Sequence, residues 1–330
     1  MTLARLAATA IGPALIAAAL HFAIPARAQS LADANAALQS GEADKALTLL
    51  ASQSTSGPDA AQASNLVCRV RYMLEQWDAA VSACEQAVRM DGNDSNYHLW
   101  LGRALGEKAA RATFLNAYGL AKRTRAEFEE AVRLDPRNAD ALADLGDFYR
   151  QAPGVVGGGI DKAQAIAVQL DKVDEARAEK LRGQIAEQQK DYAAAEAEYK
   201  KAASAGPHQA TGLAALASFY RRRQNFDAME AAVHGIESAA AHDKRGGAAL
   251  YDGAGLLIET KHDSALAASM LEEYLGGAAK SEEAPAFIAH LRLARLKEQL
   301  GDAAAAEHER TAALAMAHGY RPAQDAKAHN

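Results

Sequence analysis

The sequence is poor in the residues that build strands. Only 6% of its 330 residues are aromatic, whereas alanine alone makes up about a quarter. Proline, which interrupts helices, is also rare, with 8 residues. Alanine has the highest intrinsic helix propensity, and strands favour β-branched and aromatic residues. An all-β protein or a parallel sheet is therefore disfavoured, and we expect helices that pack through small side chains.

Signatures of the common catalytic and metal sites are also absent. The sequence contains neither HExxH nor GxSxG, and its ten histidines are scattered. The glycines at 157–159 are followed by Asp161 and Lys162 rather than by the Gly-Lys-Ser/Thr of a phosphate-binding loop. We expect this segment to be a turn, with phosphate binding at the following helix as the alternative. The sequence thus predicts no enzyme, no cofactor and no metal.

Long basic runs are missing as well. Lysine and arginine total 36 against 42 acidic residues, which gives a formal net charge of -6. The sharpest basic run, at 221–223, holds three arginines, too few for a nucleic-acid interface. We therefore expect no nucleic-acid partner.

The first segment has the composition of a secretory signal peptide. Residues 1–28 hold an early arginine, an apolar stretch and Ala26-Arg27-Ala28 before Gln29. An uncleaved membrane anchor over 6–24 is the alternative. We expect residues 1–28 to be removed, so that the mature protein is periplasmic or secreted and is not stably inserted in a membrane.

Internal repeats organise the rest of the chain. Leu142, Leu145, Gly146 and Tyr149 have the same spacing as Leu213, Leu216, Ala217 and Tyr220, which is one face of a helix. A small residue recurs on that face at positions 68, 102, 146, 183 and 217, at intervals of 34, 44, 37 and 34 residues. Two of these intervals equal the tetratricopeptide period.

At these residues, and in segments such as EQWDAAVSACEQAV and KDYAAAEAEYKKAASAGP, the chain resembles the tetratricopeptide repeat (TPR) family. It looks like an exported bacterial type with an insertion-bearing central pair of repeats, because the unit from 102 to 146 is 10 residues longer than the basic period. The resemblance implies an all-α, right-handed superhelical solenoid of about eight antiparallel hairpins. We expect it to occupy 29–318, followed by a flexible tail at 319–330.

The resemblance also implies a binding surface on the concave face, which the first helix of each hairpin lines. Chaperone-binding members of the family hold a terminal carboxylate with paired asparagine and lysine. Here Arg69 replaces the second asparagine, so that activity is not carried over. The polar stripe that helical spacing leaves on this face comprises Asn65, Arg69, Tyr72, Asn96, Arg103, Asp140, Asp147, Arg150, Lys180, Gln184, Ser218, Arg221 and Arg222.

The two cysteines fall on facing positions of one hairpin. Cys68 takes the small position of one helix, and Cys84 takes the place that Phe128 and Tyr199 hold on the second helix of other units. In an exported protein this register predicts a disulfide. Two buried free thiols are the alternative.

Two functions remain for such a chain. The first is a non-enzymatic scaffold whose concave face binds a protein or peptide, since polar groups of both signs suit hydrogen bonding to an extended segment. The second is a small-molecule-binding accessory protein, for example of a transport system, with a pocket near the glycine-rich insertion and Tyr118, Phe148 and Tyr149.

Overall fold

The computed structural model describes residues 26–51, 57, 59–243, 246–277 and 280–328, and within them every regular element is a helix. The first ten helices are α1 (Ala26–Gln39), α2 (Ala43–Ala51), α3 (Ala60–Met73), α4 (Trp77–Met90), α5 (Ser95–Arg111), α6 (Phe114–Leu134), α7 (Ala139–Gln151), α8 (Ile160–Leu170), α9 (Glu175–Gln188) and α10 (Tyr192–Ala202). The others are α11 (Gln209–Arg222), α12 (Phe226–Ala240), α13 (Gly246–Thr260), α14 (Ser264–Gly276), α15 (Ala286–Gln299), α16 (Ala303–Met316) and α17 (Arg321–Ala328), with short 3-10 turns η1 (Gly154–Val156) and η2 (Gly206–His208).

Consecutive helices pair into eight hairpins, from α1 and α2 to α15 and α16, and α17 follows the last of them. The first helix of a hairpin also contacts the first helix of the next, as α3 does with α5 and α9 with α11. This stacking is the arrangement of a tetratricopeptide-type solenoid, so the predicted fold class and the predicted number of hairpins are confirmed. The surplus residues of the long unit extend its helices: α5 has 17 residues and α6 has 21.

Small residues allow the two helices of a hairpin to approach closely. A Cβ on Gly102 of α5 would lie 2.5 Å from two ring atoms of Phe128 on α6. Gly183 of α9 faces Tyr199 of α10 in the same way, with ring atoms 3.0 Å from the place of a Cβ. The predicted small-to-aromatic register therefore exists, and each glycine leaves room for one ring.

In the second hairpin a disulfide takes the place of the glycine and the ring. Cys68 of α3 and Cys84 of α4 are bonded, their Cα atoms are 5.1 Å apart and both side chains are fully buried. Both cysteines of the described chain are used in this bond. The predicted pairing is thus present, and the alternative of two free thiols is wrong.

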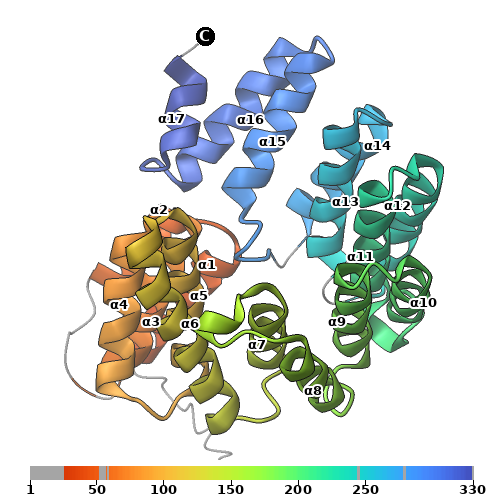
Figure 1. Ribbon diagram of the computed structural model, residues 1–330. Coiled ribbons are helices and arrows are strands. Elements are labelled where there is room, and N and C mark those ends of the chain that lie inside the picture. The colour runs from red at the N-terminus through yellow and green to blue at the C-terminus, as the bar shows by residue number, and fades with distance from the viewer. Residues whose placement is uncertain (1–25, 52–56, 58, 244–245, 278–279, 329–330) are drawn as a thin grey trace, which may run out of the picture.

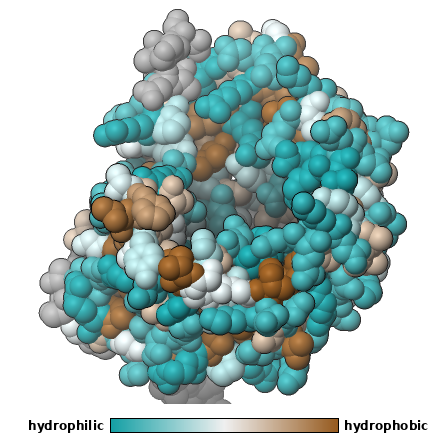
Figure 2. Space-filling view, in the orientation of Figure 1, coloured by the Kyte–Doolittle hydropathy of each residue, from teal (hydrophilic) through white to brown (hydrophobic). Residues whose placement is uncertain are grey.

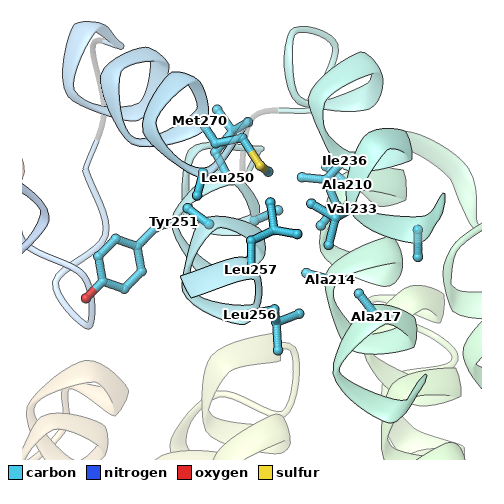
Figure 3. Packing of buried hydrophobic residues seen from close by; sticks show 14 of the residues in the cluster. Ala210, Ala214, Ala217, Val233, Ile236, Leu250, Tyr251, Leu256, Leu257 and Met270 are labelled. Atoms are coloured by element: carbon cyan, nitrogen blue, oxygen red, sulfur yellow. The ribbon is translucent and has the colours of Figure 1, made fainter. Parts of the chain in front are cut away.

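The largest apolar cluster of the described residues runs from α10 to α15, and Figure 3 shows part of it. Ala210, Ala214 and Ala217 lie along α11 and face Leu257 of α13, because alanine lets these two first helices lie close together. Tyr251, also on α13, points away from α11 and α12. Its ring therefore lies on the inner side of the solenoid, where it lines the cavity described below.

The solenoid closes on itself. In Figure 1 the hairpins run round a central space, and the blue C-terminal helices come back to the red first hairpin. One apolar cluster takes residues from both ends: Leu31, Leu38 and Leu66 from α1 and α3, with Phe287 from α15 and Tyr320 just before α17. We call this junction the seam.

Hydrogen bonds reinforce the seam. The Tyr320 hydroxyl donates to Glu75 at 2.9 Å, and the backbone N–H of His318 donates to Asp44 at 2.6 Å. The backbone N–H of Lys280, in the linker between α14 and α15, donates to the carbonyl of Gln39 at 3.1 Å. Segments more than 200 residues apart are thereby tied into a ring.

Both ends of the chain differ from the expected boundaries. The segment from 319, expected to be a flexible tail, contains α17, and Tyr320 and Ala323 are buried in the seam. Helix α1 begins at Ala26, three residues before the expected mature N-terminus at Gln29, and the remainder of the proposed signal peptide lies outside the described residues. None of the helices that the structure describes is long and apolar enough to span a bilayer.

Candidate functional site

The inner wall of the ring surrounds an open cavity of about 510 Å³, which we call the central cavity. In Figure 2 this face of the molecule is hollowed at its centre, and the rim is mostly hydrophilic. First helices of the hairpins line it, together with the linker between α14 and α15. Its charged residues are Arg103, Asp140, Asp144, Asp147, Arg177, Lys180, Asp252, Lys280 and Glu283.

Five residues of the predicted stripe meet in the central cavity. Arg103, Asp140, Asp147, Lys180 and Gln184 come from α5, α7 and α9, and all five line its wall. The helical spacing therefore located the inner face of these three helices correctly. It did not show that the face is enclosed, because the enclosure depends on the seam and on the linker.

A second opening, the N-terminal cleft, lies beside the central cavity and has a volume of about 830 Å³. Asn65, Arg69 and Asn96 of the predicted stripe line it, and so do Trp100 and Glu282. Asn65 is buried, and its side-chain nitrogen has no hydrogen-bond partner among the described residues. Asn96 is exposed and accepts a hydrogen bond from Asn138 at 3.2 Å.

Two arginines flank the indole of Trp100 at the boundary between the two openings. The guanidinium carbon of Arg69 lies 5.3 Å from the centre of a Trp100 ring, and that of Arg103 lies 4.7 Å from it. At these distances each cation is attracted by the negative face of the ring. We call Arg69, Trp100 and Arg103 the arginine clamp.

The chain's own linker occupies the arginine clamp. Arg69 donates from Nε to one carboxylate oxygen of Glu282 at 2.9 Å and from Nη2 to the other oxygen. Arg103 donates from Nη1 to Glu283 at 2.9 Å and from Nε to Asp144 of α7 at 2.5 Å. Both arginines of the clamp, which belong to the predicted stripe, are therefore already engaged with carboxylates.

Burial and the neighbouring carboxylates have opposite effects on the pKa of Arg103. Burial favours its neutral form, but Asp144 and Glu283 outweigh this and raise the pKa of the guanidinium, so it stays charged. Burial raises the pKa of Asp144, which Arg103 counteracts. Burial likewise raises the pKa of Asp252 across the cavity, against the charges of Lys180 and Arg292. The cavity thus holds charged groups of both signs: the Arg103 side chain is largely buried, whereas Lys180 and Asp252 are exposed.

The remaining predicted residues lie outside the central cavity. Tyr72 packs edge-on against Trp100, with ring centres 5.4 Å apart, and burial raises the pKa of its hydroxyl. Arg150 pairs with Asp147 at 2.8 Å, and Arg221 pairs with Glu259 at 3.4 Å.

Arg222 donates to both oxygens of Glu187, at 2.7 and 2.8 Å, and the two residues share a separate shallow opening with Arg150. Ser218 is half-buried on α11 and lines none of the openings described here. The three arginines of the C-terminal part of the predicted stripe therefore make ion pairs and do not line the central cavity.

The backbone N–H groups of the glycine-rich turn are hydrogen-bonded to nearby carbonyls. The N–H groups of Gly157, Gly158 and Gly159 donate to the carbonyls of Gly154, Pro153 and Tyr149. The ammonium group of Lys162 donates back to the carbonyl of Gly157 at 2.8 Å. These donors are therefore not directed at an anion.

A third opening, of about 590 Å³, lies next to this turn and is lined by Phe128, Phe148, Pro153 and Val156. Of the aromatic residues expected around a small-molecule pocket, only Phe148 lines it, whereas Tyr118 is 42% exposed. The opening shares Arg103 and Glu283 with the central cavity, so it belongs to the same interior. Among the described residues no group of three or more histidine, cysteine, aspartate or glutamate side chains is placed to hold a metal ion.

Sequence reasoning missed the partners of the clamp. Glu282 and Glu283 lie in a linker, where acidic residues are usually solvated, and nothing in their local sequence relates them to Arg69 and Arg103. Trp100 follows the core residue Leu99 directly and has the helical spacing of a buried residue. Only the closed ring brings these groups together.

Comparison with known proteins gives distant likenesses, and no family model matches the chain. Over 124 residues the sequence is 29% identical to Superkiller complex protein 3 of Mus musculus, a stretch that covers 36% of this chain and 7% of that protein. A thermophilic TPR protein of Thermus thermophilus is 20% identical, with 58% of this chain and 97% of that chain covered and a TM-score of 0.49.

A tetratricopeptide repeat protein from Parabacteroides merdae is 12% identical, with 84% of this chain and 98% of that chain covered and a TM-score of 0.46. The tetratricopeptide-type fold itself follows from the chain's own eight hairpins. Solenoids of this kind present an extended inner surface.

Proposed function

We propose that the protein is an exported, non-enzymatic scaffold that binds an extended segment of a partner protein on the inner face of the ring. The observation that carries this proposal is the lining of the central cavity, to which α5, α7 and α9 contribute charged groups of both signs. An extended peptide presents N–H and C=O groups at regular intervals, and such a wall can satisfy them. The composition of residues 1–28, which is that of a secretory signal peptide, supports a location in the periplasm or outside the cell.

A large apolar ligand fits the central cavity less well. Transfer of an apolar group there would strip water from Arg103, Lys180 and Asp252 without giving them new hydrogen bonds, which costs free energy. A polar peptide backbone replaces the lost water contacts. The lining therefore favours a peptide segment over a lipid or another large apolar molecule.

The test compares a charge reversal on the inner wall with the same reversal on an outer helix. Lys180→Glu places a negative charge opposite Asp252 and Glu283, whereas Lys200→Glu changes an exposed residue on α10. Tagged parent and variants are expressed in the native host, and the co-purified proteins are quantified by mass spectrometry. We expect a partner that is recovered with the parent and with Lys200→Glu but lost with Lys180→Glu. Equal recovery with both variants would place the binding surface outside the central cavity.

A further inference from the structure

Residues 281–284 of the linker between α14 and α15 are held in a defined conformation by one tyrosine. The backbone N–H of Ser281 donates to the Tyr274 hydroxyl at 2.9 Å, and that hydroxyl donates to the carbonyl of Ala284. Tyr274 is 1% exposed, so both hydrogen bonds are shielded from water. The two glutamates, Glu282 and Glu283, lie between these fixed points and reach the arginine clamp.

A linker that only joined two helices would keep its acidic side chains in water. Here the side chain of Glu282 is 12% exposed and that of Arg69 is 19% exposed, so both charges have lost most of their hydration. Burying an ion pair gains little over leaving both ions solvated, because desolvation offsets most of the attraction. Connection of α14 to α15 therefore does not explain this contact.

The geometry of the clamp is that of a recognition site for carboxylates. Arg69 engages both oxygens of Glu282 with two of its nitrogens, and both guanidinium groups lie over the Trp100 ring. Arginine is suited to this because its planar fork matches a carboxylate and stacks on aromatic rings. Two adjacent carboxylates of an extended segment can therefore pair with the guanidinium groups of Arg69 and Arg103, which are already in place.

We propose that the arginine clamp binds a segment with two adjacent acidic residues in a partner protein, and that Glu282 and Glu283 are an internal ligand that occupies it in the free protein. This inference rests on the proposed function and names the chemistry of the bound segment. An acidic segment then competes with the linker, and its binding is coupled to release of the linker from the inner wall.

The effect of the linker on the affinity of a free peptide can be estimated. A short tether keeps its ligand at an effective concentration in the millimolar range. With that competitor removed, a free peptide of about 100 μM affinity would bind on the order of tenfold more tightly, since its apparent dissociation constant is the intrinsic one divided by the fraction of protein whose clamp is free. The ratio of the two affinities therefore measures whether the linker occupies the site.

The probe is the chain's own segment, the acetylated and amidated peptide Lys-Ser-Glu-Glu-Ala-Pro that corresponds to 280–285. Binding is measured by calorimetry and by the fluorescence of Trp100, in a Trp77→Phe background that leaves Trp100 as the sole tryptophan. The opened variant is E282A/E283A. Its matched control is E272A/E273A, which removes two adjacent and exposed acidic residues of α14. E282Q/E283Q replaces the opened variant if alanine impairs folding, as judged by circular dichroism.

We expect the peptide to bind the opened variant at least tenfold more tightly than it binds the parent or E272A/E273A. Binding should be lost when Arg69→Ala and Arg103→Ala are added, or when the peptide carries glutamine in place of both glutamates. Equal affinity for the opened variant and the parent, or affinity that survives loss of both arginines, would overturn the proposal. The Lys180→Glu variant tests partner binding separately. If that variant loses the partner but the peptide does not bind the opened variant, the scaffold function is supported and only the internal-ligand proposal is refuted.

Discussion

Closure of the ring can be tested at a single glycine. Gly41 lies in the turn between α1 and α2 with a φ of 77°, and a Cβ on it would lie 2.6 Å from the backbone nitrogen of Ala286 and 2.8 Å from its Cβ. Ala286 begins α15, on the other side of the seam. The substitution Gly41→Ala therefore drives one methyl group between two segments that can move apart only if the ring opens.

The matched control is Gly301→Ala. Gly301, in the turn between α15 and α16, has a φ of 84° and nothing within 4 Å of the place of a Cβ. Both substitutions thus force an alanine into the left-handed region, which costs about 1–2 kcal/mol. Only Gly41→Ala adds a steric conflict, and overpacking of this kind typically costs about 1–3 kcal/mol. We expect about 2–5 kcal/mol of destabilisation for Gly41→Ala against about 1–2 kcal/mol for Gly301→Ala.

Urea denaturation followed by circular dichroism measures the free energies, and small-angle X-ray scattering measures the radius of gyration. The conflict is relieved if the seam opens, so Gly41→Ala should increase the radius of gyration, whereas Gly301→Ala should leave it unchanged. Identical losses of stability and identical scattering for the two variants would refute the closed ring. The comparison does not depend on the absolute stability of the chain, because both variants carry the same backbone strain.

Three further predictions concern other parts of the chain. The disulfide between Cys68 and Cys84 closes a loop with a sequence separation of 16, so its removal by C68A/C84A should cost about 3 kcal/mol in denaturation, and two free thiols in the unreduced, denatured parent would contradict the bond. Burial and a hydrogen bond with Glu198 raise the pKa of Glu179 from 4.5 to about 7. The native state then holds a proton that the unfolded chain releases, so this contribution to stability is complete below about pH 4.5 and is lost as the pH rises through about 7. Glu179→Gln should abolish that loss in melting curves recorded from pH 4 to pH 8, and an unchanged pH profile would show that the carboxyl titrates normally. Protein recovered from the native host outside the cytoplasm should have Gln29 as its N-terminus by intact mass, and retention of residues 1–28 would instead support a membrane anchor.

Local features of the fold could be predicted because their causes are local. The spacing of small residues fixes which helix face is buried, and Gly102 and Gly183 face rings as expected. The cysteines pair because the same register places Cys68 opposite Cys84. Each of these contacts spans one hairpin, so it repeats with the period of the sequence.

Contacts between the ends of the chain carry no such period. Glu75 and Tyr320 are 245 residues apart, and Tyr320 lies in a segment whose polar composition favours a flexible tail. Whether a solenoid stays open or closes depends on small rotations that accumulate over eight hairpins, and no single residue encodes their sum. The flexible tail was therefore the natural expectation from the sequence, and α17 is the consequence of closure.

Closure also changes how the inner face works. In an open solenoid a groove is accessible along its whole length, and a segment can dock from the side. In this ring the seam joins the two ends of the solenoid, and the backbone N–H of Lys280 ties the linker to Gln39 beside the seam. Release of Glu282 and Glu283 from the arginines would remove the contacts that hold the linker against α3 and α5, next to the junction on which closure depends. Occupation of the clamp by an outside segment and opening of the ring are therefore coupled equilibria, and each should favour the other.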